Sequence, residues 1–281
     1  MKIFVICIYI ISCLASTAQT IKTYTGQYNS IEPNAIYQYG IATYTYKDLD
    51  NGRLYHGNFS YSDKSNSLKG KFVDDKQDGV WILTEKTNFN SRKKYYNGKR
   101  IISVTYRNGV PDGSFSIVLV DNNNITRAYV KSNIVGDKIV GTVSADLNTR
   151  LFDFFGRNFS SAFDTPYLNK MNGSFDDAGE PVGIWKVANP TLEISEQYLS
   201  DGSISVSSYN PSTGDVITDN RPAYMPNMII EAANFALRTT TMRSTEKVQI
   251  SPIDFSESDT EQVRKNKEET VERIRKRVMG K

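Results

Sequence analysis

The sequence predicts a mainly β protein, an antiparallel β-meander of hairpin repeats with a C-terminal helical segment. Between about residues 21 and 217, short runs of alternating apolar and polar residues are separated by glycine, asparagine and aspartate. Such runs are typical of half-buried strands joined by tight turns. A duplicated segment, GKFVDDKQDGVWIL at 70–83 and GSFDDAGEPVGIWKV at 173–187, indicates a repeated unit. After residue 222 the pattern changes to a helical period.

The first 18 residues have the features of a secretory signal peptide. Lys2 precedes the apolar run IFVICIYIISCL at 3–14, and small residues follow up to Ala18. This run is shorter than the ~20 residues that a membrane-spanning helix needs, and the arrangement is that of a cleaved leader. We therefore expect cleavage after Ala18 and export to the periplasm, the outer surface or the medium. The alternative is a lipoprotein anchored at Cys13.

Cysteine usage and charge narrow the class of protein. Both cysteines, Cys7 and Cys13, lie in the leader, so the mature chain has no thiol for a disulfide or a metal site. This absence favours a bacterial exported protein. The chain has 34 basic and 31 acidic residues, and loss of Lys2 leaves 33 against 31. A chain with so small a net charge has no overall positive potential that would attract nucleic acid, so no nucleic-acid partner is expected.

Asn-Gly and Asp-Gly dipeptides predict hairpin turns within the repeat domain, which we place at 19–222. Both dipeptides tolerate the positive φ that tight hairpins require. They occur at 51–52, 97–98, 108–109, 112–113 and 201–202.

A glycine followed two residues later by an aromatic residue is the centre of the repeat. The repeat glycines are at 57, 79, 113, 141 and 183, and the unit at 141 has valine at 143 in place of the aromatic residue. The three clearest pairs are Gly79 with Trp81, Gly113 with Phe115, and Gly183 with Trp185. One hairpin cannot bury such a face alone, so the units must stack. We expect acidic residues to form the turn, glycine to permit it, and tryptophan to fill the seam between hairpins.

The segments NGVPDGSF at 108–115 and DGVW at 78–81 resemble the variant MORN repeat of the family known as YwqK-type antitoxins. The resemblance covers about residues 44–210, unevenly. It implies an elongated antiparallel meander and a role in protein interaction or at the envelope surface.

The C-terminal segment, 223–281, is predicted to be helical in two parts. Apolar residues at 229, 232, 233 and 236 form a stripe that begins after Pro226, so a helix over 228–237 should dock on the sheet. A polar connector at 238–256 follows. A capping box at 258–261 then opens a charged helix to about Val278. Its basic end, 273–277, is either solvated or a peripheral contact with anionic lipid.

No motif in the chain predicts catalytic residues, a cofactor or a metal. His56 is the sole histidine, and beside a hairpin glycine it is expected to be a strand-edge side chain. The acidic pairs 74–75 and 176–177 occupy equivalent places in the two clearest repeats. Carboxylates gathered in a turn are able to hold calcium, but local hydrogen bonds within the turn are the favoured interpretation.

A tyrosine-rich stretch is the speculative binding site. Its residues are Tyr37, Tyr39, Tyr44, Tyr46 and Tyr61. On an open sheet such rings would form a platform for sugars, whereas as cross-strand pairs they would only stabilise the sheet. The predicted function is a non-enzymatic protein- or glycan-binding or scaffolding module of the bacterial cell envelope. The alternative is a glycosidase-like hydrolase that uses two carboxylates not identified in the sequence.

Overall fold

The computed structural model describes residues 20–28, 40–50, 52–91, 94–147, 168–189, 192–199, 203–219 and 225–242. Several predictions lie outside these residues. They are the signal peptide with its alternative anchor Cys13, two of the candidate tyrosines (Tyr37 and Tyr39), and the charged helix after residue 257.

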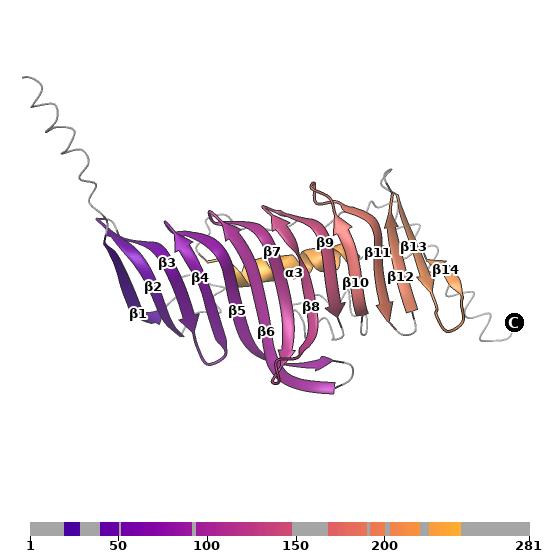
Figure 1. Cartoon of the computed structure of the whole chain (residues 1–281), viewed down its shortest axis with the longest axis horizontal. Coiled ribbons are helices and arrows are strands. Elements are labelled where there is room, and N and C mark those ends of the chain that lie inside the picture. Colours follow the sequence, from indigo (N-terminus) through magenta and orange to yellow (C-terminus); the bar gives the residue numbers. More distant parts are fainter. Residues whose placement is uncertain are drawn as a thin grey trace, which may run out of the picture.

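The described residues form one antiparallel sheet of 14 strands whose spatial order is the chain order. Figure 1 shows the strands side by side along the long axis of the molecule. The predicted meander is therefore confirmed. The strands are β1 (Ile21–Tyr28), β2 (Gly40–Leu49), β3 (Gly52–Ser62), β4 (Asn66–Val73), β5 (Lys76–Ser91), β6 (Lys94–Arg107), β7 (Val110–Asp121), β8 (Thr126–Val135), β9 (Lys138–Leu147), β10 (Leu168–Phe175), β11 (Pro181–Asn189), β12 (Leu192–Tyr198), β13 (Ile204–Tyr209) and β14 (Val216–Asp219).

A single helix in the described part of the chain, α3 (Met225–Thr240), packs across strands β5 to β9 and lies behind the sheet in Figure 1. Ile229, Ala232, Ala233 and Ala236 of its predicted stripe are buried, so the predicted docking is confirmed. The helix continues past residue 237, where the polar connector was expected to begin. Thr239 and Thr240 are buried as well. The Thr239 hydroxyl donates to carbonyls of its own helix, and the sheet supplies polar partners to Thr240.

Those partners attach the end of α3 to β5 and β6. Gln77 Nε2 donates to the Thr240 carbonyl at 2.9 Å, and the Met242 amide donates to Gln77 Oε1 at 2.7 Å. The Tyr106 hydroxyl lies 2.9 Å from Thr240 Oγ1, and burial raises the pKa of this phenol. Buried polar groups cost free energy when unpaired, so these contacts fix the position of the helix end.

Five hairpins share one irregularity of strand register. Lys71 pairs with Asp78 and Lys69 pairs with Ile82, so Gly70 alone on β4 faces residues 79–81 on β5. The same two-residue excess occurs in β2–β3, β6–β7, β8–β9 and β10–β11. The excess residues of each hairpin include one of the repeat glycines, all with positive φ: Gly57, Gly79, Gly113, Gly141 and Gly183. The repeat predicted from the sequence is therefore a β-bulge repeat.

The turn predictions need correction at several places. In the β4–β5 hairpin the turn is Asp74–Asp75, with φ of 48° and 64°, and Gly79 lies beyond it in the bulge. The dipeptides at 97–98 and 112–113 lie inside β6 and β7. The Asn108–Gly109 pair, with φ of 52° and 84°, is a turn as predicted. Glycine thus permits the bulge in the repeat, and the turn is made by the two residues with left-handed backbone.

Each tryptophan of the repeat lies over a glycine of the neighbouring strand. A Cβ placed on Gly70 would lie 2.1 Å from Trp81 Cδ2, and one on Gly173 would lie 2.1 Å from Trp185 Cδ2. The first glycine of each duplicated segment therefore makes room for the indole. Trp81 also packs edge-on against Phe72, with ring centroids 4.9 Å apart. The tryptophan–glycine contact lies between β4 and β5, and between β10 and β11, so it is within a single hairpin and not, as predicted, between hairpins.

The two indole N–H groups differ in their surroundings. Trp81 Nε1 donates to the Lys71 carbonyl at 3.2 Å. Trp185 Nε1 is buried and has no hydrogen-bond partner within the described part of the chain. The indole N–H is therefore hydrogen-bonded in the first copy of the repeat and unpaired at the equivalent position of the second copy.

Neighbouring hairpins are joined at the edge that carries the repeated turns. The amides of Asp75, Gly109 and Gly136 donate to the carbonyls of residues 55, 77 and 111 of the preceding hairpin, each at 2.8 Å. Each accepting residue lies two positions before a bulge glycine. Turn, bulge and neighbouring hairpin therefore form one regular unit.

Candidate functional site

The sheet face opposite α3, which we call the open face, carries a continuous row of short side chains. Register pairs connect one residue of each strand from β1 to β13 into this central row. Its members are Thr25, Thr43, Ser60, Lys69, Ile82, Ser103, Ser116, Lys131, Ser144, Asn172, Lys186, Ser195 and Ser207. All are exposed or half-buried. The row runs along the long axis that Figure 1 shows, perpendicular to the strands.

Hydroxyl groups dominate the central row, and some of them link adjacent members of the row. Ser103 Oγ and Ser116 Oγ are 2.9 Å apart, and Thr25 Oγ1 and Thr43 Oγ1 are 3.0 Å apart. Short side chains that pair across strands make this part of the open face flat. Such a surface presents many donors and acceptors, and its shape suits an extended partner.

The charges in the central row all have one sign. Three members are lysines and none is an aspartate or glutamate. Lys186 Nζ lies 3.6 Å from Glu193 in the adjoining row, and both side chains are well exposed. Lys69 and Lys131 take part in no ion pair among the described residues. Lys131 Nζ lies 5.3 Å from the centroid of the Tyr129 ring, a contact that does not neutralise its charge, so the charges of both lysines are available to a partner.

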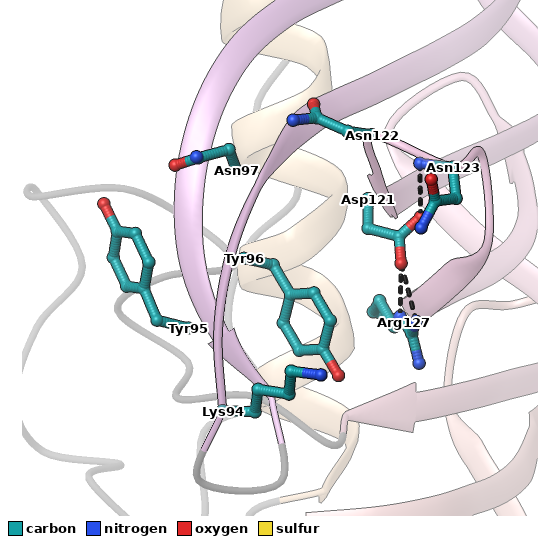
Figure 2. A pocket seen from close by; sticks show the side chains of 8 residues that line it. All are labelled: Lys94, Tyr95, Tyr96, Asn97, Asp121, Asn122, Asn123 and Arg127. Carbon is teal, nitrogen blue, oxygen red and sulfur yellow. Dashed lines mark hydrogen bonds and ion pairs between the residues drawn. The ribbon is translucent and has the colours of Figure 1, made fainter.

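A second candidate site is a pocket of about 240 Å³ beside the long β5–β6 hairpin, which extends well past its neighbours. Figure 2 shows the eight side chains that line it. They are Lys94, Tyr95, Tyr96, Asn97, Asp121, Asn122, Asn123 and Arg127. The pocket is smaller than the ~300–1,000 Å³ typical of small-molecule sites, so it suits a single small group.

The Tyr96 ring is held between Phe89 and Arg127 in this pocket. Its centroid lies 5.7 Å from that of Phe89 and 4.5 Å from the Arg127 guanidinium carbon. Arg127 Nη2 lies 2.6 Å from Asp121 Oδ2, as Figure 2 shows. Burial works to raise the pKa of the Asp121 carboxyl, but Arg127 and two loop amides outweigh it and lower the pKa. The acid is therefore a structural anion that holds the loop at 121–125.

The three described candidate tyrosines do not form an open platform. Tyr44, Tyr46 and Tyr61 are 7%, 7% and 2% exposed and belong to the core. Tyr44 lies on Tyr24, with centroids 5.0 Å apart. The prediction of an exposed aromatic face is wrong for these three residues, because the period-two pattern places them on the face that packs against the core. Their role is the cross-strand pairing named as the alternative.

The two acidic turns have different hydrogen-bond partners, and one of them includes the histidine. Asp74 Oδ1 accepts from Lys47 Nζ at 2.8 Å and lies 2.9 Å from His56 Nδ1. The hydrogen bonds from Lys47 and His56 lower the pKa of the Asp74 carboxyl. In the equivalent copy, Asp176 Oδ1 accepts two amides of its own loop, from Ala178 and Glu180. Asp176 therefore makes the predicted hydrogen bonds within its own turn. The prediction is wrong for Asp74, which instead joins its turn to β2 and β3 of the preceding hairpin.

The residues that the structure describes contain no group of three histidine, cysteine or acidic side chains placed to hold a metal ion. Within the same residues, no helix combines the length and apolar character required to cross a membrane.

The sequence interpretation missed two features of the described structure. The central row was visible as serine or threonine at alternate positions, as in Thr43 and Thr45 or Ser114 and Ser116. In the sequence this alternation predicts only the polar half of half-buried strands. The second feature is the attachment of the end of α3 by Gln77. No local sequence pattern indicates this role, because the partners of Gln77 lie more than 160 residues further along the chain.

Comparisons with known proteins add no relative. No protein-family model matches the chain, and neither the curated proteins nor the solved structures searched contain a match.

Proposed function

We propose that this chain is an exported, non-enzymatic β-repeat protein that binds or scaffolds a protein or glycan partner in the bacterial cell envelope. The observation that carries the proposal is the central row, which crosses 13 strands with mainly hydroxyl and amide side chains, three lysines, one isoleucine and no carboxylate. A face that served only for solubility has no need of such a regular composition. The MORN-like repeat supplies the rigid support for this face.

The pocket supports binding over hydrolysis. A glycosidase mechanism needs two carboxyl groups about 5–10 Å apart, across the scissile bond. The pocket is lined by one carboxylate, Asp121, and that group is ion-paired with Arg127. The remaining lining, with two tyrosines and three asparagines, suits recognition of a polar group such as a sugar ring.

Site-directed shielding of the open face tests this function. Both native cysteines lie within 1–18, so the exported protein carrying Ser116→Cys has one thiol to which a polyethylene glycol maleimide can be attached. Lys64→Cys, in the β3–β4 turn, is the matched control. Binding of both conjugates to glycan arrays and to isolated envelope fractions is then compared. We expect the conjugate at position 116 to lose binding and the one at 64 to keep it; equal binding of the two would reject the open face as the site.

Export itself has a separate test. Mass spectrometry of the mature N-terminus should find Gln19 as the first residue. A diacylglyceryl group on Cys13 would instead establish the lipoprotein alternative, and an intact leader would contradict export.

A further inference from the structure

The lysines of the central row stand at intervals along it. Lys69 lies on β4, Lys131 on β8 and Lys186 on β11. Neighbouring strands are about 4.8 Å apart, so the three strands are separated by about 19 Å and about 14 Å. The cationic part of the row is therefore about 34 Å long.

Between the lysines the row offers hydroxyl and amide groups. Ser103 and Ser116 lie between the first two lysines, and Ser144 and Asn172 lie between the last two. Sugar hydroxyls form hydrogen bonds with such groups, while lysine pairs with carboxylate or sulfate. The alternation of cation and neutral polar groups complements a chain that carries anions at intervals among hydroxyls.

Other polyanions fit the row less well. Proteins that bind single-stranded nucleic acid stack its bases on aromatic side chains, and the row has none. Surface binding to a membrane needs a band of apolar side chains that enters the lipid, and Ile82 is the only apolar member of the row. The carboxylates nearest the row, Asp78, Asp146 and Glu193, lie in flanking rows.

We propose that the central row binds a linear acidic polysaccharide, laid across the strands along the long axis of the sheet. The inference rests on the proposed function and names the chemistry of the partner. Charge complementarity at Lys69, Lys131 and Lys186 selects the anionic polymer, and the hydroxyl groups between them bind its neutral parts.

Binding of the purified protein to dextran, dextran sulfate and polygalacturonate tests the inference, because the first two share one backbone. We expect binding to both acidic polymers, none to dextran, and weakening as salt rises. Lys69→Gln with Lys131→Gln should weaken binding about fivefold, from about 0.5 kcal/mol for each exposed charge pair. Lys64→Gln with Arg238→Gln, in the β3–β4 turn and on α3, removes the same charge away from the row and should leave binding within about twofold.

Four results would overturn the inference: equal loss in the two double variants, equal binding to dextran, no binding to either acidic polymer, or binding only to phosphatidylglycerol vesicles or single-stranded DNA. The shielding experiment separates this failure from that of the proposed function. If the conjugate at position 116 loses a protein or neutral-glycan partner, the open face is a binding site and only the acidic polymer is excluded.

Discussion

Substitution of Gly70 tests whether the glycine exists to make room for Trp81. In Gly70→Ala the new Cβ would lie 2.1 Å from Trp81 Cδ2 and 2.3 Å from Cε2. This is about 1.4 Å inside the 3.5 Å of a normal carbon contact. Overpacking of a core costs typically ~1–3 kcal/mol, and the lower entropy of the unfolded alanine chain returns ~0.5 kcal/mol. We expect a net loss of about 1–2 kcal/mol in the free energy of unfolding.

A double-mutant cycle with Trp81→Phe identifies the cause of that loss. A smaller ring removes the overlap, so Gly70→Ala should cost less in the Trp81→Phe background, with a coupling energy of about 1–2 kcal/mol. The third repeat already has a smaller ring and a larger neighbour, since Phe115 pairs with Val104. Unfolding in guanidinium chloride, followed by far-ultraviolet circular dichroism, measures all four proteins without relying on the indole signal.

Gly79→Ala is the matched control for this cycle. A Cβ at this position meets no atom within 4 Å, but φ is +71°. The cost, about 1–2 kcal/mol, is then a backbone cost. It should add to that of Trp81→Phe within about 0.5 kcal/mol. If the Gly70 cycle were as additive as the Gly79 cycle, the steric explanation would be refuted.

Three further predictions concern the helix attachment, the unequal tryptophans and pH. Gln77→Leu leaves the Thr240 carbonyl and a neighbouring amide unpaired, and should cost about 2–3 kcal/mol; faster amide exchange in α3 relative to β2 would show this, and unchanged exchange would contradict it. Trp185→Phe removes an unpaired donor, whereas Trp81→Phe removes a paired one. Trp81→Phe should therefore be more destabilising than Trp185→Phe by about 1 kcal/mol in the same denaturation assay. A larger loss of stability in Trp185→Phe would contradict this explanation. The Asp74 carboxyl has a pKa below its ordinary value of 3.8 because of its lysine and histidine partners. Its contribution to stability is therefore present above pH 3.8 and lost as pH falls through the folded-state pKa. Asp74→Asn should make the acid limb of the stability curve shallower, and an unchanged limb would refute the assignment.

Much of the architecture follows from local sequence. Alternation predicts strands, and the spacing of five glycines predicts a repeated unit. At each glycine, however, the structure has a β-bulge where a turn was predicted, because only glycine adopts a left-handed backbone inside a strand at low cost. The stripe after Pro226 predicted both the helix and its buried face. These features depend on contacts between residues that are close in the chain or that repeat.

The sequence does not show as reliably which residues share a face of the sheet and which stand opposite each other on neighbouring strands. Each bulge changes the register by two residues, so which residues stand opposite each other depends on where every bulge falls. The pairing of Trp81 with Gly70 and the alignment of 13 side chains into one row emerge only when all registers are known. The tyrosines of β2 were placed on a binding surface because aromatic content alone does not distinguish a core from a platform.

The regular edge of the hairpin stack has an evolutionary consequence. Bulge glycines 79, 113 and 141 each lie four residues after a two-residue turn, whereas strand and loop lengths vary at the opposite edge, where the β5–β6 hairpin is longest. Duplication of a gene segment that encodes one such hairpin would insert two strands without disturbing the registers on either side. The protein would then grow in increments of about 10 Å, so descendants of one ancestor can differ in reach while keeping the same contacts between neighbours.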